Sequence, residues 1–424
     1  MQHFDFLVIG SGPAGQRAAI QAAKLGKNAA IIERRPVVGG VSVHTGTIPS
    51  KTLREAVLYL TGWDQRGVYG RSYRLKDKLD INDLMKRLDI TLNHEIEVME
   101  HQLIRNGVTV IQGSASFVDP HRIKVEKPDG HFEEYTADKF LIAVGSRPAR
   151  PEGIPFDNDI ILDSDGILNL KRIPRSMIVV GAGVIGVEYA SIFSTMDVKV
   201  TLVDGRPSLL DFMDKEIIDE LVHSMRDRGV LLRLGERVAR VEKTDKGTAI
   251  CELESGKRMQ AEAILFAAGR IGCTYTLGLE NAGLETDSRR RLSVNEHLQT
   301  AVPHIYAAGD IIGFPALAST SMEQGRLAAC HAMGVEACQT QEFFPFGIYA
   351  VPEMSMIGAT EHELTEKKTP YEIGVARLRE TARGQIMGLQ EGVLKLLVGL
   401  EDRKLLGVHI IGEGATELIH IGQA

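Results

Sequence analysis

A ten-residue stretch, Phe6-Leu-Val-Ile-Gly10-Ser-Gly12-Pro-Ala-Gly15, is matched further along the chain by Met177-Ile-Val-Val-Gly181-Ala-Gly183-Val-Ile-Gly186. Each copy is a β-branched strand that runs into a G-x-G-x-x-G turn, and a helical pattern rich in alanine and isoleucine follows. A second apolar strand then ends in an acid, which is Glu33 in the first unit and Asp204 in the second. The glycines and the acid are displaced by the same 171 residues (Gly10 to Gly181, Glu33 to Asp204), so the chain contains an internal repeat.

Each part of this pattern has a task in binding a dinucleotide. The first glycine makes a tight turn, the second lets the backbone approach a pyrophosphate, and the third lets the helix pack on the strand. The helix N-terminus binds the diphosphate, and the acid accepts a hydrogen bond from a ribose hydroxyl. One such turn alone is weak evidence, because a Gly-rich βα turn without a ligand is the alternative. Two turns in the full context predict an α/β protein with two Rossmann-like dinucleotide-binding domains.

The length and composition fit a large enzyme that does not bind a highly charged surface. A chain of 424 residues predicts two to four domains, and its net charge of −7 is spread along the sequence. We therefore expect neither a nucleic-acid partner nor a membrane partner. The four cysteines, Cys251, Cys273, Cys330 and Cys338, show no C-x-x-C spacing. Together with the lack of a signal-peptide pattern, this predicts reduced thiols and a cytoplasmic location.

The stretch Gly39-Gly-Val-Ser42-Val-His-Thr-Gly-Thr47-Ile-Pro-Ser-Lys51 resembles the redox-motif region of the two-dinucleotide-binding flavoprotein disulfide reductases. In that family, two cysteines stand at the positions of Ser42 and Thr47. A hydroxyl forms neither a disulfide nor a thiolate beside the flavin, so the usual route to a disulfide substrate is closed. What remains is hydride exchange between flavin and nicotinamide, which predicts a transhydrogenase.

Nearly the whole chain resembles one subfamily, the soluble pyridine nucleotide transhydrogenases. The run from Gly46 to Ala56 is the most specific sign, because threonine replaces the second cysteine in that subfamily's pattern, and residues 382–385 and 419–423 are also similar. One departure is Ser42, where these enzymes often keep a cysteine. The resemblance implies FAD as cofactor, NAD and NADP as substrates, a homodimer or higher homo-oligomer, and no metal.

The order of the motifs predicts the domain organisation. We expect the first part of an FAD-binding domain at 1–148, an inserted NAD(P)-binding domain at 149–271, the second FAD part at 272–341 and an interface domain at 342–424. Residues 62–102 read as a charged, largely helical excursion. The interface domain should contain short strands at 347–351, 354–358, 393–398 and 405–411, and then a helix from Thr416. Family members continue beyond this point, so we expect an incomplete interface domain.

The resemblance also implies roles for individual residues. Lys51, which should open the helix after Pro49, would lie beside the flavin and stabilise the anionic reduced ring. Glu188 would pair with this lysine and contact the nicotinamide amide, and these two are the predicted catalytic residues. Asp310, after a buried strand, would reach the ribityl chain, and a helix near 316–329 would point its N-terminus toward the flavin. The predicted cofactor-binding residues are Gly10, Gly12, Gly15, Glu33, Arg34, Gly40, Ser42, Thr47, Lys51, Gly145, Asp310, Gly181, Gly183, Gly186, Glu188, Asp204, Arg206 and Gly269.

Several alternatives stay open on the sequence alone. Lys51 could be a solvated lysine, Glu188 a helix-surface acid and Asp310 an N-cap. Asp204 can accept from the 2′-hydroxyl of NAD, while Arg206 either pairs with the 2′-phosphate of NADP or is a surface arginine in a turn. A chain that carries both signals is suited to binding the two dinucleotides in turn. An NAD(P)H oxidase or diaphorase, and a non-catalytic flavin-binding redox module, are the competing functions.

Overall fold

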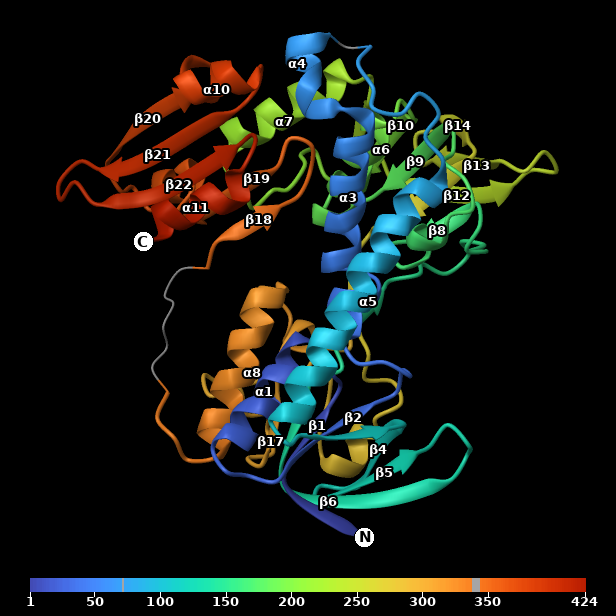
Figure 1. Ribbon diagram of the computed structural model, residues 1–424, viewed down its shortest axis with the longest axis vertical. Coiled ribbons are helices and arrows are strands. Elements are labelled where there is room, and N and C mark those ends of the chain that lie inside the picture. Colours follow the sequence, from blue (N-terminus) through green and yellow to red (C-terminus); the bar gives the residue numbers. More distant parts are fainter. Residues whose placement is uncertain (71, 338–343) are drawn as a thin grey trace. The chain divides into compact units, whose positions relative to one another are not determined.

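The computed structural model describes residues 1–70, 72–337 and 344–424 (Figure 1). The chain forms two compact units, each assembled from separate segments. Unit 1 contains residues 1–50, 88–149 and 270–340, and unit 2 contains residues 51–87, 150–269 and 341–424. The predicted α/β class is confirmed. The predicted domain boundary at 341 and Cys338 lie outside the described residues, and the domain limits stay a prediction.

Unit 1 is built on a seven-stranded sheet with the order β3-β2-β1-β6-β5-β4, and β17 pairs with β6. The strands β1 (Gln2–Ile9), β2 (Ala29–Glu33), β3 (Thr109–Gln112) and β17 (Ile305–Ala307) join this sheet in parallel pairs. An antiparallel edge is formed by β4 (Ser114–Asp119), β5 (Arg122–Glu126) and β6 (Phe132–Ile142). All five residues of β2 are buried, as expected for a parallel strand covered on both faces.

Two helices of unit 1 pack closely against each other, α1 (Pro13–Lys24) and α8 (Ala318–Ala332) (Figure 1, dark blue and orange). A Cβ on Gly325 would lie 2.0 Å from the carbonyl oxygen of Ala14, so only glycine allows this approach. The helix α8 confirms the prediction of a helix near 316–329. The remaining elements are α2 (Gly40–His44), β7 (Ser146–Pro148), β16 (Arg270–Gly272) and the 3-10 turns η3 (Leu279–Ala282) and η4 (Asp310–Ile312).

Unit 2 repeats the parallel arrangement in a sheet of order β11-β10-β9-β15-β8. Its strands are β8 (Ile161–Asp163), β9 (Ser176–Val180), β10 (Lys199–Asp204), β11 (Leu231–Leu234) and β15 (Ala263–Phe266), and its helices are α6 (Val184–Thr195) and α7 (Lys215–Asp227). Both ends of α6 lie 171 residues after the ends of α1, which confirms the repeat. A separate antiparallel sheet contains β12 (Val238–Lys243), β13 (Ala249–Leu253) and β14 (Arg258–Ala261), and η2 (Gly166–Asn169) follows β8.

The third sheet of unit 2 is antiparallel, with the order β18-β19-β22-β21-β20. Its strands are β18 (Phe346–Ile348), β19 (Met354–Gly358), β20 (Tyr371–Arg377), β21 (Val393–Gly399) and β22 (Leu405–Ile411), with helices α9 (Glu361–Glu366), α10 (Ala382–Met387) and α11 (Ala415–Gln423) and the turn η5 (Leu378–Glu380). Three predicted strands and the last helix are confirmed. The strand predicted at 347–351 is wrong beyond Ile348, because the N–H groups of Tyr349 and Val351 donate to Glu188 and Ser191 instead of to a neighbouring strand.

The excursion predicted at 62–102 is largely helical, with η1 (Trp63–Gln65), α4 (Arg66–Tyr69) and α5 (Ile81–Arg105), and α3 (Thr47–Thr61) precedes it. The prediction that Lys51 opens a helix after Pro49 is wrong, because α3 already begins at Thr47. Proline is tolerated in this first turn, where its missing N–H costs no intrahelical hydrogen bond.

Candidate functional site

The first G-x-G-x-x-G turn joins β1 to α1 in unit 1. Gly10 has a φ of 103°, and a Cβ on it would lie 2.5 Å from the carbonyl oxygen of Ala143. A Cβ on Gly15 would lie 1.9 Å from the carbonyl oxygen of Gly10. At Gly12 the space is open, because a Cβ there would meet no described atom within 4 Å. Gly12 is the N-cap and carries no side chain, so the first N–H groups of α1 remain for a diphosphate, and the turn fits this group.

The acid of the first unit is fixed by the residue between the two glycines. Glu33 is 7% exposed, and its Oε2 accepts hydrogen bonds from the N–H (3.0 Å) and the hydroxyl of Ser11. Its Oε1 accepts from the N–H of Arg35 at 2.8 Å. Ser11 stands at a variable position of the motif, so the sequence did not single it out. Arg34 makes a different contact: its Nη1 donates to the hydroxyl of Tyr275 at 3.2 Å.

The segment that resembles a redox motif lies directly beside this turn. Gly40 has a φ of 60°, and a Cβ on it would lie 2.7 Å from Cα of Gly12. Ser42 is buried in α2, where its hydroxyl donates to the carbonyl oxygen of Gly39 at 2.9 Å. Thr47, the first residue of α3, is exposed. The positions of the two expected cysteines therefore carry one buried and one exposed hydroxyl.

Asp310 is held by a chain of hydrogen bonds within unit 1. It follows the buried strand β17 and begins η4, and its Oδ2 accepts from the Ser146 hydroxyl at 2.6 Å. Arg270 donates to this hydroxyl through Nε (2.8 Å) and to the Ser146 carbonyl oxygen through Nη2 (2.8 Å). Gly145, just before Ser146, has a φ of 66°. The N-cap of η4 is Gly309, so the N-cap alternative for Asp310 does not describe the structure.

The second G-x-G-x-x-G turn has the same geometry in unit 2. A Cβ on Gly181, with a φ of 109°, would lie 2.5 Å from the carbonyl oxygen of Ala267, and one on Gly186 would lie 1.8 Å from that of Gly181. A Cβ on Gly183 would again meet no described atom within 4 Å. Gly269 turns the chain after β15 with a φ of 112°. This second helix N-terminus also fits a diphosphate.

The acid of the second unit is bound by an arginine. Asp204 Oδ1 accepts from the N–H (2.8 Å) and Nε (3.1 Å) of Arg206, and Oδ2 accepts from Arg206 Nη2 (3.0 Å) and from the N–H of Ala182. Arg206 Nη1 also donates to Asp211 Oδ1 at 3.2 Å. Burial acts to raise the pKa of Asp204, but the hydrogen bonds from Arg206 and Ala182 hold it below its usual value. The two residues expected to select between NAD and NADP thus bind each other.

The two predicted catalytic residues are brought together in unit 2. Lys51 Nζ donates to both carboxylate oxygens of Glu188, at 2.7 and 2.8 Å, and Glu188 is only 3% exposed. The N–H of Tyr349 donates to Glu188 Oε1 at 2.9 Å, and the ring of Tyr349 has its centre 4.9 Å from Lys51 Nζ. No local sequence pattern selects Tyr349, which lies 161 residues after Glu188. The helix-surface alternative does not describe the buried Glu188, and the solvated alternative does not describe Lys51, whose side chain is partly buried against it.

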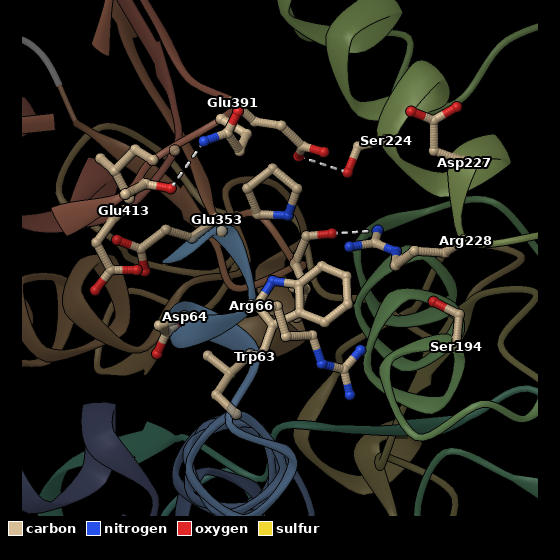
Figure 2. A pocket seen from close by; sticks show the side chains of 18 of the residues that line it. Trp63, Asp64, Arg66, Ser194, Ser224, Asp227, Arg228, Glu353, Glu391 and Glu413 are labelled. Atoms are coloured by element: carbon tan, nitrogen blue, oxygen red, sulfur yellow. Dashed lines mark hydrogen bonds between the residues drawn. The ribbon is translucent and has the colours of Figure 1, made fainter. Parts of the chain in front are cut away.

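Unit 2 also contains a cavity of about 410 Å³ that none of the predicted site residues lines (Figure 2). Trp63 lies on its wall, with the guanidinium carbons of Arg66 and Arg228 at 4.9 and 5.2 Å from the ring centre. Burial lowers the pKa of Arg228 to about 10. Burial also raises the pKa of Glu353 and Glu413 on the same wall. Cationic and acidic groups thus line the same cavity, and this mixture of charges does not indicate one class of ligand.

One group of carboxylates in the described part of the chain is compact enough to hold a metal ion: Asp214, Glu216 and Glu361. The buried ammonium of Lys395 lies among them, with Nζ at 2.8 Å from Asp214 Oδ1 and 3.1 Å from Glu216 Oε2, and it also contacts Glu361. A lysine therefore supplies the positive charge that a metal ion would bring. Across residues 1–70, 72–337 and 344–424, no helix is both long and apolar enough to cross a membrane.

Comparison with known families covers nearly the whole chain. The family model of pyridine nucleotide-disulphide oxidoreductases matches residues 4–325, and the model of the dimerisation domain of these oxidoreductases matches residues 344–424. A soluble pyridine nucleotide transhydrogenase of Mycobacterium bovis is 55% identical over all of this chain and 91% of its own length. One from Klebsiella pneumoniae is 46% identical over 99% of this chain and 90% of its own.

Solved structures show the same fold. LpdA from Mycobacterium tuberculosis has a TM-score of 0.91 and 27% identity, over 99% of this chain and 92% of that protein. A Cu(II) complex of the HOCl-induced flavoprotein disulfide reductase RclA from Escherichia coli has a TM-score of 0.89 and 27% identity, over 100% of this chain and 92% of that one.

Proposed function

The chain belongs to the pyridine nucleotide-disulphide oxidoreductase family and is a flavoprotein enzyme of the soluble transhydrogenase type, and we propose that it transfers hydride between NADPH and NAD⁺ through FAD without a redox disulfide. The predicted family and enzyme class are confirmed. The match to the dimerisation domain indicates a homo-oligomer. The two half-reactions, the site residues and the cytoplasmic location remain proposals.

The observation that carries this proposal is the pair of hydroxyls at Ser42 and Thr47. The sequence contains no cysteine before Cys251. Cys251, Cys273 and Cys330 are buried, and burial raises the pKa of the Cys251 thiol to about 11 and also raises that of Cys273. A buried, protonated thiol is a poor nucleophile. The described residues therefore favour a reaction in which hydride is the only group transferred.

Bound FAD would supply a ring that accepts hydride from one nicotinamide and returns it to another. In unit 1, the turn from Gly10 to Gly15 would hold its diphosphate and Glu33 its ribose. Asp310, oriented by Ser146, would accept hydrogen bonds from the ribityl chain. The Cβ contacts at Gly10 and Gly15 and the buried partners of Glu33 support this assignment, because they fix both groups before any ligand arrives.

In unit 2, the turn from Gly181 to Gly186 would hold the nicotinamide dinucleotide. The Glu188 carboxylate fixes Lys51 and can accept from the carboxamide of the nicotinamide. The Lys51 ammonium would stabilise negative charge as hydride arrives on the flavin, a form of electrostatic catalysis that a preorganised ion pair can provide. Hydride exchange needs no general acid or base. The Lys51–Glu188 ion pair, in which the carboxylate is buried and the lysine partly buried, supports these two roles.

An assay with NADPH and a nicotinamide analogue of NAD⁺, followed beside an oxygen electrode, tests the proposal. We expect the analogue to be reduced in step with NADPH oxidation and without oxygen uptake. Oxygen uptake equal to NADPH oxidation would instead identify an oxidase. A chain that holds FAD but reduces neither acceptor would be a binding module.

A further inference from the structure

The arginine at the tip of β10 is already engaged. Arg206 donates from Nε and Nη2 to Asp204 and from Nη1 to Asp211. A 2′-phosphate that approached this guanidinium would also approach two carboxylates, whose acceptor oxygens lie at 3.0 to 3.2 Å from its nitrogens. Repulsion between like charges would offset much of the attraction. Arg206 is therefore better placed to orient the Asp204 carboxylate than to bind a phosphate.

A second arginine lies over the same turn. Asp204 ends β10 and pairs in register with Leu234, which ends β11. The chain then stays bound to the β10 turn, since the N–H of Gly235 donates to the Arg206 carbonyl oxygen (2.9 Å) and that of Glu236 to the Asp204 carbonyl oxygen (3.0 Å). Arg237 comes next. A Cβ on Gly205 would lie 3.0 Å from Arg237 Cγ and 3.1 Å from its Nε, so the arginine side chain crosses the turn where Gly205 leaves room.

The charge of Arg237 is not neutralised locally. Arg237 is exposed, and within the described ranges its guanidinium forms no ion pair and no hydrogen bond. The acid next to it, Glu236, is bound by Lys257, and this hydrogen bond lowers the Glu236 pKa. Two arginines thus flank Gly205, and among the residues that the structure describes Arg206 has carboxylate partners whereas Arg237 has none.

We propose that Arg237 receives the 2′-phosphate of NADP(H), while Asp204, held by Arg206, accepts from the ribose hydroxyls of NAD(H). In a Rossmann domain the 2′ position of the ribose lies beside the acid at the end of the second strand, where an arginine accommodates the phosphate. Arg237 offers an unpaired guanidinium at this place, and a charge-assisted, bidentate contact to phosphate suits arginine. Neither dinucleotide would have to break the Asp204–Arg206 pair. The inference rests on the proposed function.

The test compares two adenosine fragments that differ only in the 2′-phosphate, adenosine 2′,5′-bisphosphate and 5′-AMP. Their binding to the FAD-loaded enzyme is measured by calorimetry for the parent and for Arg237→Met, Arg237→Lys and Arg206→Met. Arg240→Met, which removes an exposed arginine of β12, three residues after Arg237, is the matched control. FAD content and melting temperature establish that each variant is folded.

We expect Arg237→Met to weaken binding of the bisphosphate about 10- to 100-fold, the loss of one charge-assisted contact, and to change 5′-AMP binding less than twofold. Arg237→Lys should retain most of the parent's affinity for the bisphosphate, and Arg240→Met should change the affinity for neither fragment. A selective loss of bisphosphate binding in Arg206→Met, with Arg237→Met unchanged, would overturn the inference, as would equal losses for both fragments in Arg237→Met. Because the fragments lack nicotinamide, a failure of hydride transfer in the parent would refute the proposed function without altering this result.

Discussion

The two dinucleotide turns have nearly the same backbone and differ in what holds the acid. In unit 1, the hydroxyl of Ser11 donates to Glu33 from inside the protein. In unit 2, Ala182 stands at the equivalent position and offers only its N–H, and Arg206, whose side chain is 41% exposed, supplies the remaining donors to Asp204. Among the described residues, the first acid accepts from the buried Ser11 and from the backbone N–H of Arg35, whereas the second is bound by a partly exposed guanidinium.

This difference matches what each unit is proposed to bind. A resident cofactor gains from a site whose groups are fixed and buried, because little ordering remains to be done on binding. A substrate that must leave in every cycle, and that comes with or without a 2′-phosphate, gains from an exposed edge with a free charge nearby. The motif sets the shared turn, and the residues around the acid set the difference.

The largest expected effect comes from filling the open space at the second glycine of each turn. Gly12 and Gly183 have extended backbones that any residue adopts, so valine at either position should leave the fold intact. Gly12→Val should remove FAD from the purified protein. Gly183→Val should keep FAD but lower transhydrogenation by about 100-fold or more, because its side chain occupies the diphosphate position.

Absorption spectra, turnover assays and melting temperatures of the two variants would check this pair. Loss of FAD from Gly183→Val, or its retention by Gly12→Val, would reverse the assignment of the two turns.

A second prediction concerns the charge of Lys51. Lys51→Met should slow reduction of FAD by NADPH about 100-fold and change the Kd for NADPH much less, because the ammonium interacts more strongly as negative charge develops. Rapid mixing under anaerobic conditions measures this step directly. Tyr349→Phe, which keeps the aromatic face over Nζ, is the control and should stay close to the parent. A parent-like rate in Lys51→Met with FAD bound would exclude the electrostatic role.

A smaller effect is expected at Ser11. Ser11→Ala removes one hydroxyl donor from Glu33 and keeps the N–H, so the loss should be about 0.5–1.5 kcal/mol, or roughly two- to tenfold in FAD affinity. Fluorescence titration of the apoprotein with FAD gives this Kd. NADPH binding, which belongs to the other unit, should not change. An effect on NADPH as large as that on FAD would show that the two turns are not independent.

The smallest expected effect is a pH dependence that should be nearly absent. Because the pKa of Asp204 is lowered, its pairing with Arg206 stabilises the fold above the ordinary aspartate pKa and is lost only as pH falls through the lowered value. The Kd for NAD⁺, whose diphosphate keeps its charge across this range, should therefore vary less than twofold between pH 8 and pH 5. A marked weakening in this range would mean that Asp204 takes up a proton near neutrality.

The sequence was sufficient for the features that repeat. Strand, turn, helix and acid of both units follow from local pattern, since the first and third glycines of each turn make approaches that only glycine allows, and the second leaves open space. Contacts between residues far apart in the chain could not be predicted from local pattern, because they depend on tertiary packing. They include Tyr349 beside Glu188, Ser146 and Arg270 beside Asp310, and Arg237 beside Gly205. The sequence analysis did not predict the edge strand β20, although Tyr371, Ile373 and Val375 alternate along it, because glycine is disfavoured in strands and Gly374 stands at its centre. The start of α3 differs from the prediction because Pro49 lies within the first turn of the helix, where proline is tolerated.

Anaerobic spectroscopy of the two half-reactions is the most direct test of whether hydride passes between NADPH and NAD⁺ through a flavin with no thiol beside it. NADPH should bleach the yellow protein with no long-wavelength thiolate–flavin charge-transfer band. Added NAD⁺ should then restore the colour and yield one NADH per flavin. A charge-transfer band on two-electron reduction, or a bleached flavin that NAD⁺ does not reoxidise, would contradict it.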